Sequence, residues 1–195
     1  MGIATLSLTQ VAALAPSDIA ALTRTDMTAL TPDKISALGS DQIAAFGSTQ
    51  LAAWSAAQVR YLSGTQVVAL TAAQLASLPA TLLSALTTSQ IDSLTTDQLA
   101  ALPSSQLGKL AATQIKALTT SQVAALSADQ LSGFPATAIA SLSQTQVAAL
   151  PTSAVAALSA TQIAGLSSLQ VAGFSSDQLN VLSATAVDRK GQLWV

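Results

Sequence analysis

The chain has 195 residues, half of them hydrophobic, and its seven lysine and arginine residues against nine acidic ones give a formal net charge of −2. Because the basic residues are few and scattered, we expect no nucleic-acid-binding face. Cysteine and histidine do not occur, which excludes disulfides and thiol chemistry and removes the commonest general base and metal ligand. We therefore predict neither an enzyme nor a cofactor, metal or small-molecule site.

An eight-residue unit repeats along almost the whole chain, and Thr119–Leu126 is a typical copy. Leucine stands at 19 of the 23 positions reached from Leu6 in steps of eight, and Val, Ile, Leu or Met stands at all 24 positions reached from Ile3. Gln directly precedes this aliphatic residue in 16 of 23 units. We call these the leucine, aliphatic and glutamine positions. Because no insertion or deletion interrupts the period, the sequence predicts a stacked array.

Each unit has the pattern of one short helix. The residue after the leucine position, here called the cap position, is Ser or Thr in 15 of 23 units, and the glutamine position follows three residues later. This spacing is a capping box, in which the hydroxyl and the glutamine side chain satisfy backbone N–H groups at the helix start. Proline at the cap position or directly after it would also stop a helix from running through, and this applies to Pro16, Pro32, Pro79, Pro103, Pro135 and Pro151.

These features predict an all-α solenoid of about 24 very short capped helices, one per repeat. In one continuous helix the apolar stripe would drift by about 80° per unit, and a β-solenoid would need alternation with period two. We expect a single continuous solenoid over residues 1–190, with a charged N-terminal end at residues 1–46 and a C-terminal tail at residues 191–195. The aliphatic and leucine positions should together form its core.

The charged end places Asp18, Asp26 and Lys34 at the glutamine position in three consecutive units. In one interpretation, Asp18 and Asp26 lie at equivalent places on neighbouring helices and share a cation, although two carboxylates fall short of the six to eight oxygens of a calcium site. In the other, these charges form a solvated end cap, which a solenoid needs for solubility. We favour the end cap.

An aromatic and basic segment follows. Phe46 and Trp54 stand at the leucine position, which favours a place in the core. Tyr61 stands at the small position, the residue before the leucine position, which is Ala, Gly or Ser in 19 of 23 units, and it directly follows Arg60. Trp54, Arg60 and Tyr61 are therefore the candidate residues for contact with a partner.

The glutamine position is expected to be half-buried, because apolar residues replace Gln in several units: Leu82, Ala138, Ala154 and Ala186. Glutamine carries both a carbonyl acceptor and two N–H donors. The sequence therefore predicts a stacked row of amides that are hydrogen-bonded to the backbone at the turns between helices.

No membrane-spanning segment is expected, because even the uncharged residues 130–176 contain polar residues in every unit and no run approaches about 18 apolar residues. The start, Met1-Gly2-Ile3, lacks the basic and apolar regions of a signal peptide. Since the array already begins at Ile3, we expect a piece of a longer chain or a designed or trimmed array.

The unit Ser/Thr-x-x-Gln-aliphatic-Ala-Ala-Leu, found at Thr95–Leu102 and Ser159–Leu166, resembles octapeptide-repeat stretches of large bacterial secreted or surface proteins. The likeness covers nearly the whole chain and brings no catalytic residue with it. It implies a spacer or exposed repeat region, at an extracellular or cell-surface location.

Three functions remain. The favoured one is a non-enzymatic structural repeat scaffold or spacer. The second is a protein-binding repeat module, whose partner is another protein or a second copy, with Trp54, Arg60 and Tyr61 as contacts. The third is an ice-binding face, because Thr stands two residues after the cap position in ten units and Ser in five more. Local hydrogen bonds in the first helical turn would explain the same preference.

Overall fold

The computed structural model describes residues 2–188, and its side chains as far as residue 182. The prediction of an all-α protein with one short helix per repeat is confirmed, and no strand occurs among the described residues. A 3₁₀ helix, η1 (Ile3–Thr5), precedes the α-helices. These are α1 (Leu8–Ala12), α2 (Pro16–Ala20), α3 (Arg24–Thr28), α4 (Pro32–Ala37), α5 (Ser40–Ala44), α6 (Ser48–Leu51), α7 (Ala56–Arg60), α8 (Gly64–Ala69), α9 (Ala72–Ser77), α10 (Ala80–Leu83), α11 (Thr88–Ser93), α12 (Thr96–Ala100), α13 (Ser104–Leu107), α14 (Ala112–Lys116), α15 (Thr120–Ala124), α16 (Ala128–Ser132), α17 (Ala136–Ser141), α18 (Gln144–Ala148), α19 (Thr152–Ala156), α20 (Ala160–Ala164), α21 (Ser168–Val171) and α22 (Ser176–Asp188).

The chain divides into two compact units, Met1–Ala101 and Leu102–Val195. The first unit contains η1 and helices α1 to α12, and the second contains α13 to α22. A single continuous solenoid over residues 1–190 stays a prediction, and the expected tail at residues 191–195 lies outside the described residues.

Capping makes these helices short and regular. At a typical start, Thr119 has an extended backbone with φ −69° and ψ 161°, and its hydroxyl accepts a hydrogen bond from the N–H of Gln122 at 3.1 Å. The same hydroxyl-to-N–H bond recurs where the cap residue is Ser, for example from Gln58 to Ser55 at 3.2 Å. The helices from α1 to α21 therefore span only four to six residues each, as the capping pattern predicts.

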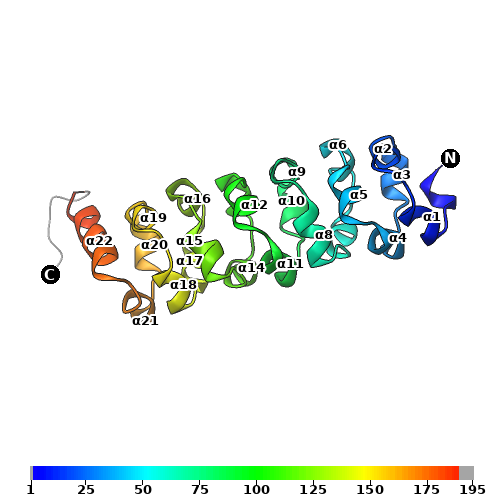
Figure 1. Cartoon of the computed structure of the whole chain (residues 1–195). Helices are drawn as coiled ribbons and strands as arrows, with labels where there is room; N and C mark the ends of the chain where they lie inside the picture. Colours follow the sequence, from blue (N-terminus) through cyan, green and yellow to red (C-terminus); the bar gives the residue numbers. More distant parts are fainter. Residues whose placement is uncertain (1, 189–195) are drawn as a thin grey trace. The chain divides into compact units, whose positions relative to one another are not determined.

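Within each unit the chain winds so that a helix contacts the helix three places earlier. In the first unit α2, α5, α8 and α11 contact one another in succession, and in the second α13, α16, α19 and α22 do the same. Figure 1 shows the winding of the first unit, where α2, α6 and α9 lie along one edge and α4, α8 and α11 along the other. The number of helices in one turn, which the repeat itself does not reveal, is thus between three and four.

The aliphatic and leucine positions form the core of each unit, as predicted. In the first unit Val67 is 0% and Leu70 is 3% exposed, and in the second Ile115 is 0% and Leu118 is 3% exposed. The side chain of Lys34 is also buried. Apolar burial on this scale is what stabilises helices that are too short to persist alone.

At two small positions the backbones of successive turns approach closely. The hydroxyl of Ser141, at the end of α17, donates to the carbonyl of Ala112, the first residue of α14, at 3.2 Å. A Cβ atom added to Gly133 would lie only 2.6 Å from the carbonyl oxygen of Ser104, the first residue of α13. Small residues suit Ser141 and Gly133 because there the C-terminal end of one helix packs on the backbone of the helix three places earlier.

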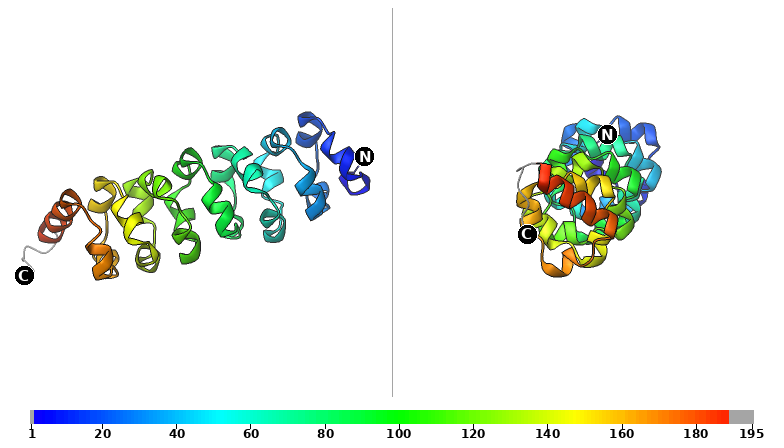
Figure 2. Two further views of the ribbon diagram at one scale, coloured as in Figure 1. Left: turned by 60° about the horizontal axis from the view of Figure 1, so that its bottom comes forward. Right: turned by 90° about the vertical axis from the view of Figure 1, so that its left-hand side faces the viewer.

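The last helix differs from the prediction of a separate helix for each repeat. Helix α22 runs for 13 residues, through the cap position at Ser183, and it is visibly the longest helix in Figure 2. The expected last two helices are therefore one. Among the 23 complete units, this unit alone lacks both a proline at or after the cap and a Gln or Asp at the glutamine position, where Ala186 stands. A serine at the cap position alone therefore does not end the preceding helix here.

We predict that Leu118→Ala lowers the free energy of unfolding by about 2–5 kcal/mol, because it leaves a cavity in a closed part of the core. Leu166→Ala, at the same position of a partly exposed turn, should cost clearly less. Urea denaturation of both variants measures the difference. An equal or larger loss for Leu166→Ala would show that the leucine position does not stabilise the array through burial.

Candidate functional site

The glutamine position is the polar site that recurs through both units. At Gln66, in α8, the side-chain oxygen accepts a hydrogen bond from the N–H of Ser63, the cap of the same helix, at 2.9 Å. Its Nε2 group donates to the carbonyl oxygens of Ile35 at 2.7 Å and Leu38 at 2.8 Å, at the end of α4. One buried amide therefore joins the start of its own helix to the end of the helix four places earlier.

This arrangement repeats with one register. The Nε2 group donates to the leucine-position carbonyl 28 residues earlier, at 2.5–2.9 Å, in Gln42, Gln50, Gln58, Gln66, Gln74, Gln90, Gln98, Gln130, Gln146, Gln162, Gln170 and Gln178. Backbone groups at helix ends have no partner within the helix, and the glutamine amide satisfies groups at two such ends.

The predicted row of glutamine amides bonded to the backbone is therefore present, but the side chains are more buried than the sequence suggested. All glutamines at this position other than Gln10 are only 2–9% exposed. Gln10 lies in the first described turn, and it is exposed. Burial follows from the bridge itself, because the amide must reach across the seam between two turns.

Lys34 takes over the same bridge with different chemistry. Its side chain is 9% exposed, and its Nζ donates to the carbonyls of Ile3 at 2.8 Å and Ala4 at 2.7 Å. Ile3 and Ala4 lie 31 and 30 positions before Lys34 in the sequence. Gln42 likewise donates to carbonyl oxygens 31 and 30 positions before it. The ammonium group of Lys34 therefore replaces the donating half of the glutamine bridge.

Asp18 and Asp26 keep the capping contact but, as carboxylates, cannot donate to a carbonyl of another turn. Asp18 accepts from the N–H of Ala15 at 2.9 Å. Asp26 accepts from the N–H and the hydroxyl of Thr23 at 2.9 and 2.6 Å, and from the N–H of Ile3 at 2.9 Å. The Thr23 hydroxyl, followed by the N–H groups of Thr23 and Ile3, lowers the pKa of Asp26 below the usual 3.8.

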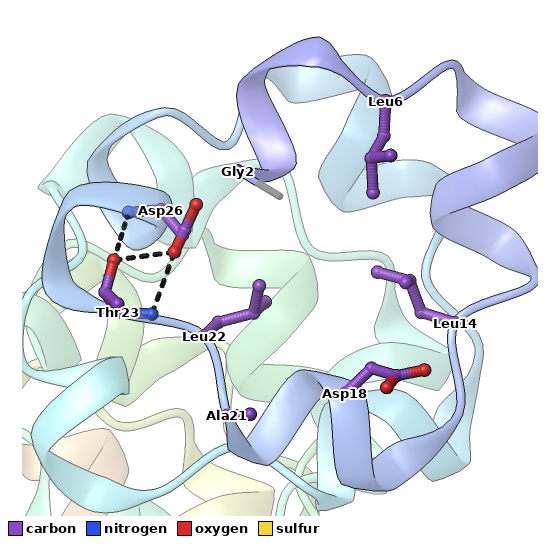
Figure 3. Close-up of a pocket in the computed structure, with 8 residues that line it drawn as sticks. All are labelled: Gly2, Leu6, Leu14, Asp18, Ala21, Leu22, Thr23 and Asp26. Atoms are coloured by element: carbon purple, nitrogen blue, oxygen red, sulfur yellow. Dashed lines mark hydrogen bonds between the residues drawn. The ribbon is translucent and has the colours of Figure 1, made fainter.

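The two carboxylates border one hollow in the first turn (Figure 3), but the structure gives little support to a shared cation. The Asp26 carboxylate is held by Thr23 and Ile3, and no group of three acidic, histidine or cysteine side chains that could hold a metal occurs within residues 2–188. Of the three charges predicted to form a solvated end cap, Asp18 is exposed and Asp26 is partly exposed, but the prediction is wrong for Lys34, whose side chain is buried.

Proline caps remove the donor on which the glutamine oxygen depends. Within the described residues, 15 of the 16 glutamines at this position accept from their own cap N–H. The remaining one, Gln106, follows Pro103, and its buried Oε1 atom has no hydrogen-bond partner. Proline has no N–H to donate.

The sequence already indicates this dependence on the cap, although the prediction above attributed the apolar residues to half-burial alone. Three of the four units with proline at the cap position have an apolar residue at the glutamine position: Leu82 after Pro79, Ala138 after Pro135 and Ala154 after Pro151. These replacements therefore reflect the loss of the cap N–H, because a buried amide oxygen without a donor is unfavourable.

The three candidate contact residues do not share one surface. Trp54 is 4% exposed and packs edge-to-face on Phe46, with ring centroids 5.4 Å apart. Arg60 is exposed, and its Nε donates to the carbonyl of Ala85 at 3.0 Å. Tyr61 is 49% exposed. The accessible part of the candidate contact is therefore Arg60 with Tyr61, while Trp54 belongs to the core.

Nine of the ten threonines proposed for an ice-binding face are exposed, and the tenth, Thr185, lies outside the described side chains. Several of the nine bond locally. Thr65, Thr145 and Thr161 lie 2.8–3.0 Å from the hydroxyl of the serine that caps their own helix. Such contacts agree with the local explanation of the threonine preference. The ice-binding face stays a prediction.

The fold and the repeated glutamine bridge define an all-α octapeptide-repeat protein. A family model described as the ALTTAQ repeat matches residues 19–56. The order of letters in that description corresponds to the small position, leucine position, cap and glutamine position, as in Ala117-Leu118-Thr119-Thr120-Ser121-Gln122. No curated protein matches the chain. Among the described residues, no helix is long and apolar enough to cross a membrane.

We predict that Gln66→Ala lowers the free energy of unfolding by about 1–3 kcal/mol, because it leaves buried backbone groups at two helix ends without partners. Gln10→Ala, which removes only a capping contact from an exposed side chain, should cost less than about 1 kcal/mol. Urea denaturation compares the two. Equal losses would contradict the role of the bridge between turns.

A double-mutant cycle tests the proline rule in α17. Ala138→Gln alone should destabilise the protein, because Pro135 gives the buried amide oxygen no donor. Adding Pro135→Ser restores the N–H, so we expect a favourable coupling of about 0.5–1.5 kcal/mol between the two changes. The single variant Pro135→Ser is the control, and strictly additive effects would show that the missing cap N–H is not the cause.

Proposed function

We propose that the protein is a non-enzymatic structural repeat scaffold that acts as a spacer. The observation that carries this proposal is the repeated bridge from a buried glutamine to the backbone 28 residues earlier, found in both units. A spacer must hold fixed distances under thermal motion, and a recurring bridge between successive turns is a direct means of doing so.

The bridge acts together with the apolar core. In a repeat array each element contacts only its neighbours, so stability and stiffness accumulate from the contacts between turns. Here the core contact is non-directional, whereas the glutamine hydrogen bonds fix which residues of two turns face each other. We therefore expect distances within one unit to depend on the number of repeats between two points.

Distance measurement within the first unit tests the proposal. Because the chain has no cysteine, Ser17→Cys and Ser89→Cys provide two exposed labelling points. Pulsed electron paramagnetic resonance between spin labels should give a narrow distance distribution. Adding Gln50→Ala and Gln66→Ala should broaden it, while Gln10→Ala, which breaks no bridge between turns, should leave it unchanged. A broad distribution in the labelled but otherwise unchanged protein would contradict the spacer role.

A protein-binding module is the second candidate, and the pair Arg60 and Tyr61 favours it. Tyr61 exposes half of a large ring at a position otherwise occupied by small residues, and the adjacent guanidinium suits a partner with an acidic group. Capture of a partner should be lost in Tyr61→Ala and retained in Val68→Ala, which removes another exposed apolar side chain. Equal capture by both variants would reject this surface. The extracellular or cell-surface location stays a prediction from the resemblance alone.

A further inference from the structure

Two contacts between successive turns of the second unit have alanine in place of glutamine. The contact between two turns at the glutamine position is here called a seam. Ala138 in α17 and Ala154 in α19 stand at this position, and they are 1% and 0% exposed. At the seam of Gln162, in the same unit, the Nε2 group donates to the carbonyl oxygens 31 and 28 residues earlier, at 2.9 and 2.8 Å. The methyl group of alanine makes neither hydrogen bond.

The leucine-position carbonyl groups at these two seams are buried. They belong to Leu110 and Leu126, which lie 28 residues before Ala138 and Ala154 and are 5% and 2% exposed. Within residues 2–182, no backbone or side-chain group donates a hydrogen bond to either carbonyl oxygen. In folded proteins nearly all buried carbonyl groups bind the backbone, a side chain or an ordered water, because leaving them unpaired is costly. The two carbonyl groups therefore point to a donor from outside the chain.

Alanine occupies less of the seam than the side chain that it replaces. Glutamine has four heavy atoms beyond its Cβ, and these take up more space than a water molecule, whose share of the liquid volume is roughly 30 Å³. Leu82 also follows a proline cap, but its longer side chain places carbon atoms at this position, where it is 6% exposed. A small polar ligand therefore suits the two alanine seams and not the seam of Leu82.

The groups at these seams select a ligand that donates hydrogen bonds. Pro135 and Pro151, at the caps, have no N–H for a ligand to accept. At the corresponding place in the first unit, the ammonium group of Lys34 donates to the carbonyls of Ile3 and Ala4, so that charged and uncharged donors both fit such carbonyl groups. Two carbonyl oxygens fall far short of the six to eight oxygen ligands of calcium.

We propose that each alanine seam binds one small hydrogen-bond donor, a water molecule or an ammonium ion, in place of the glutamine amide. At the seam of Ala154 this ligand donates to the carbonyl oxygens of Leu126 and Val123, and at the seam of Ala138 it donates to the equivalent pair. The ligand thus restores the donating half of the bridge where a proline cap has removed the glutamine. This inference goes beyond the proposed spacer function and does not depend on it.

Oxygen-17 magnetic relaxation dispersion, which measures the number of long-lived buried waters, tests the proposal on the full chain. Ala154→Leu, which introduces the residue that occurs naturally at Leu82, should lower this number, and adding Ala138→Leu should lower it again. The control Ala100→Val changes an exposed alanine to the residue that stands at the same place of another repeat, Val68, and should leave the number unchanged. Circular dichroism establishes that every variant is folded.

Measurements in sodium chloride and in ammonium chloride, at equal ionic strength, distinguish the two ligands. A number of buried waters that falls in Ala154→Leu in both salts identifies water. If the bound donor is ammonium, ammonium chloride should raise the melting temperature of the unchanged chain but not that of Ala154→Leu with Ala138→Leu. The proposal is overturned if the leucine variants change neither the number of waters nor the response to ammonium, or if Ala100→Val has the same effect as they do.

Discussion

The structure depends on the hydrogen bonds of one buried, uncharged side chain. Helices of four to six residues are too short to be stable alone in water, and each leaves unsatisfied N–H and C=O groups at its ends. Glutamine carries one acceptor and two donors on a neutral group. It can therefore satisfy the N–H at its own helix start and carbonyls of the previous turn without the free-energy cost of burying a charge.

The departures from glutamine follow from the same requirement. Where the cap is proline there is no N–H to accept, and apolar residues such as Ala138 stand instead. In the first turn Asp18 and Asp26 can only accept, Asp18 from the N–H of its cap residue and Asp26 from its cap residue and from the N–H of Ile3. Where Ala186 follows a cap without proline, the preceding helix runs on. Each local change thus has a local structural consequence.

Much of this fold could be predicted from the sequence, because capping and apolar periodicity are local. The cap at Thr119 and the core place of Leu118 follow from spacings within eight residues. The partner of the glutamine amide could not be predicted, since every unit resembles every other and a perfect repeat does not mark the carbonyl 28 residues earlier. The pairing of proline caps with apolar residues, as in Pro135 and Ala138, does indicate in the sequence that the glutamine oxygen needs the cap N–H. The prediction that Trp54 contacts a partner relied on its residue type. Because Trp54 stands at the leucine position, its side chain lies in the core instead.

Hydrogen exchange of the glutamine side-chain amides, followed by NMR, tests the bridge between turns most directly. The side-chain N–H groups of Gln66 and Gln162 donate to buried carbonyls in the first and second unit, while Gln10 is exposed in the first turn. We predict slow exchange at Gln66 and Gln162, comparable to that of core backbone amides, and fast exchange at Gln10. Equally fast exchange at all three would contradict the conclusion that these amides hold successive turns together.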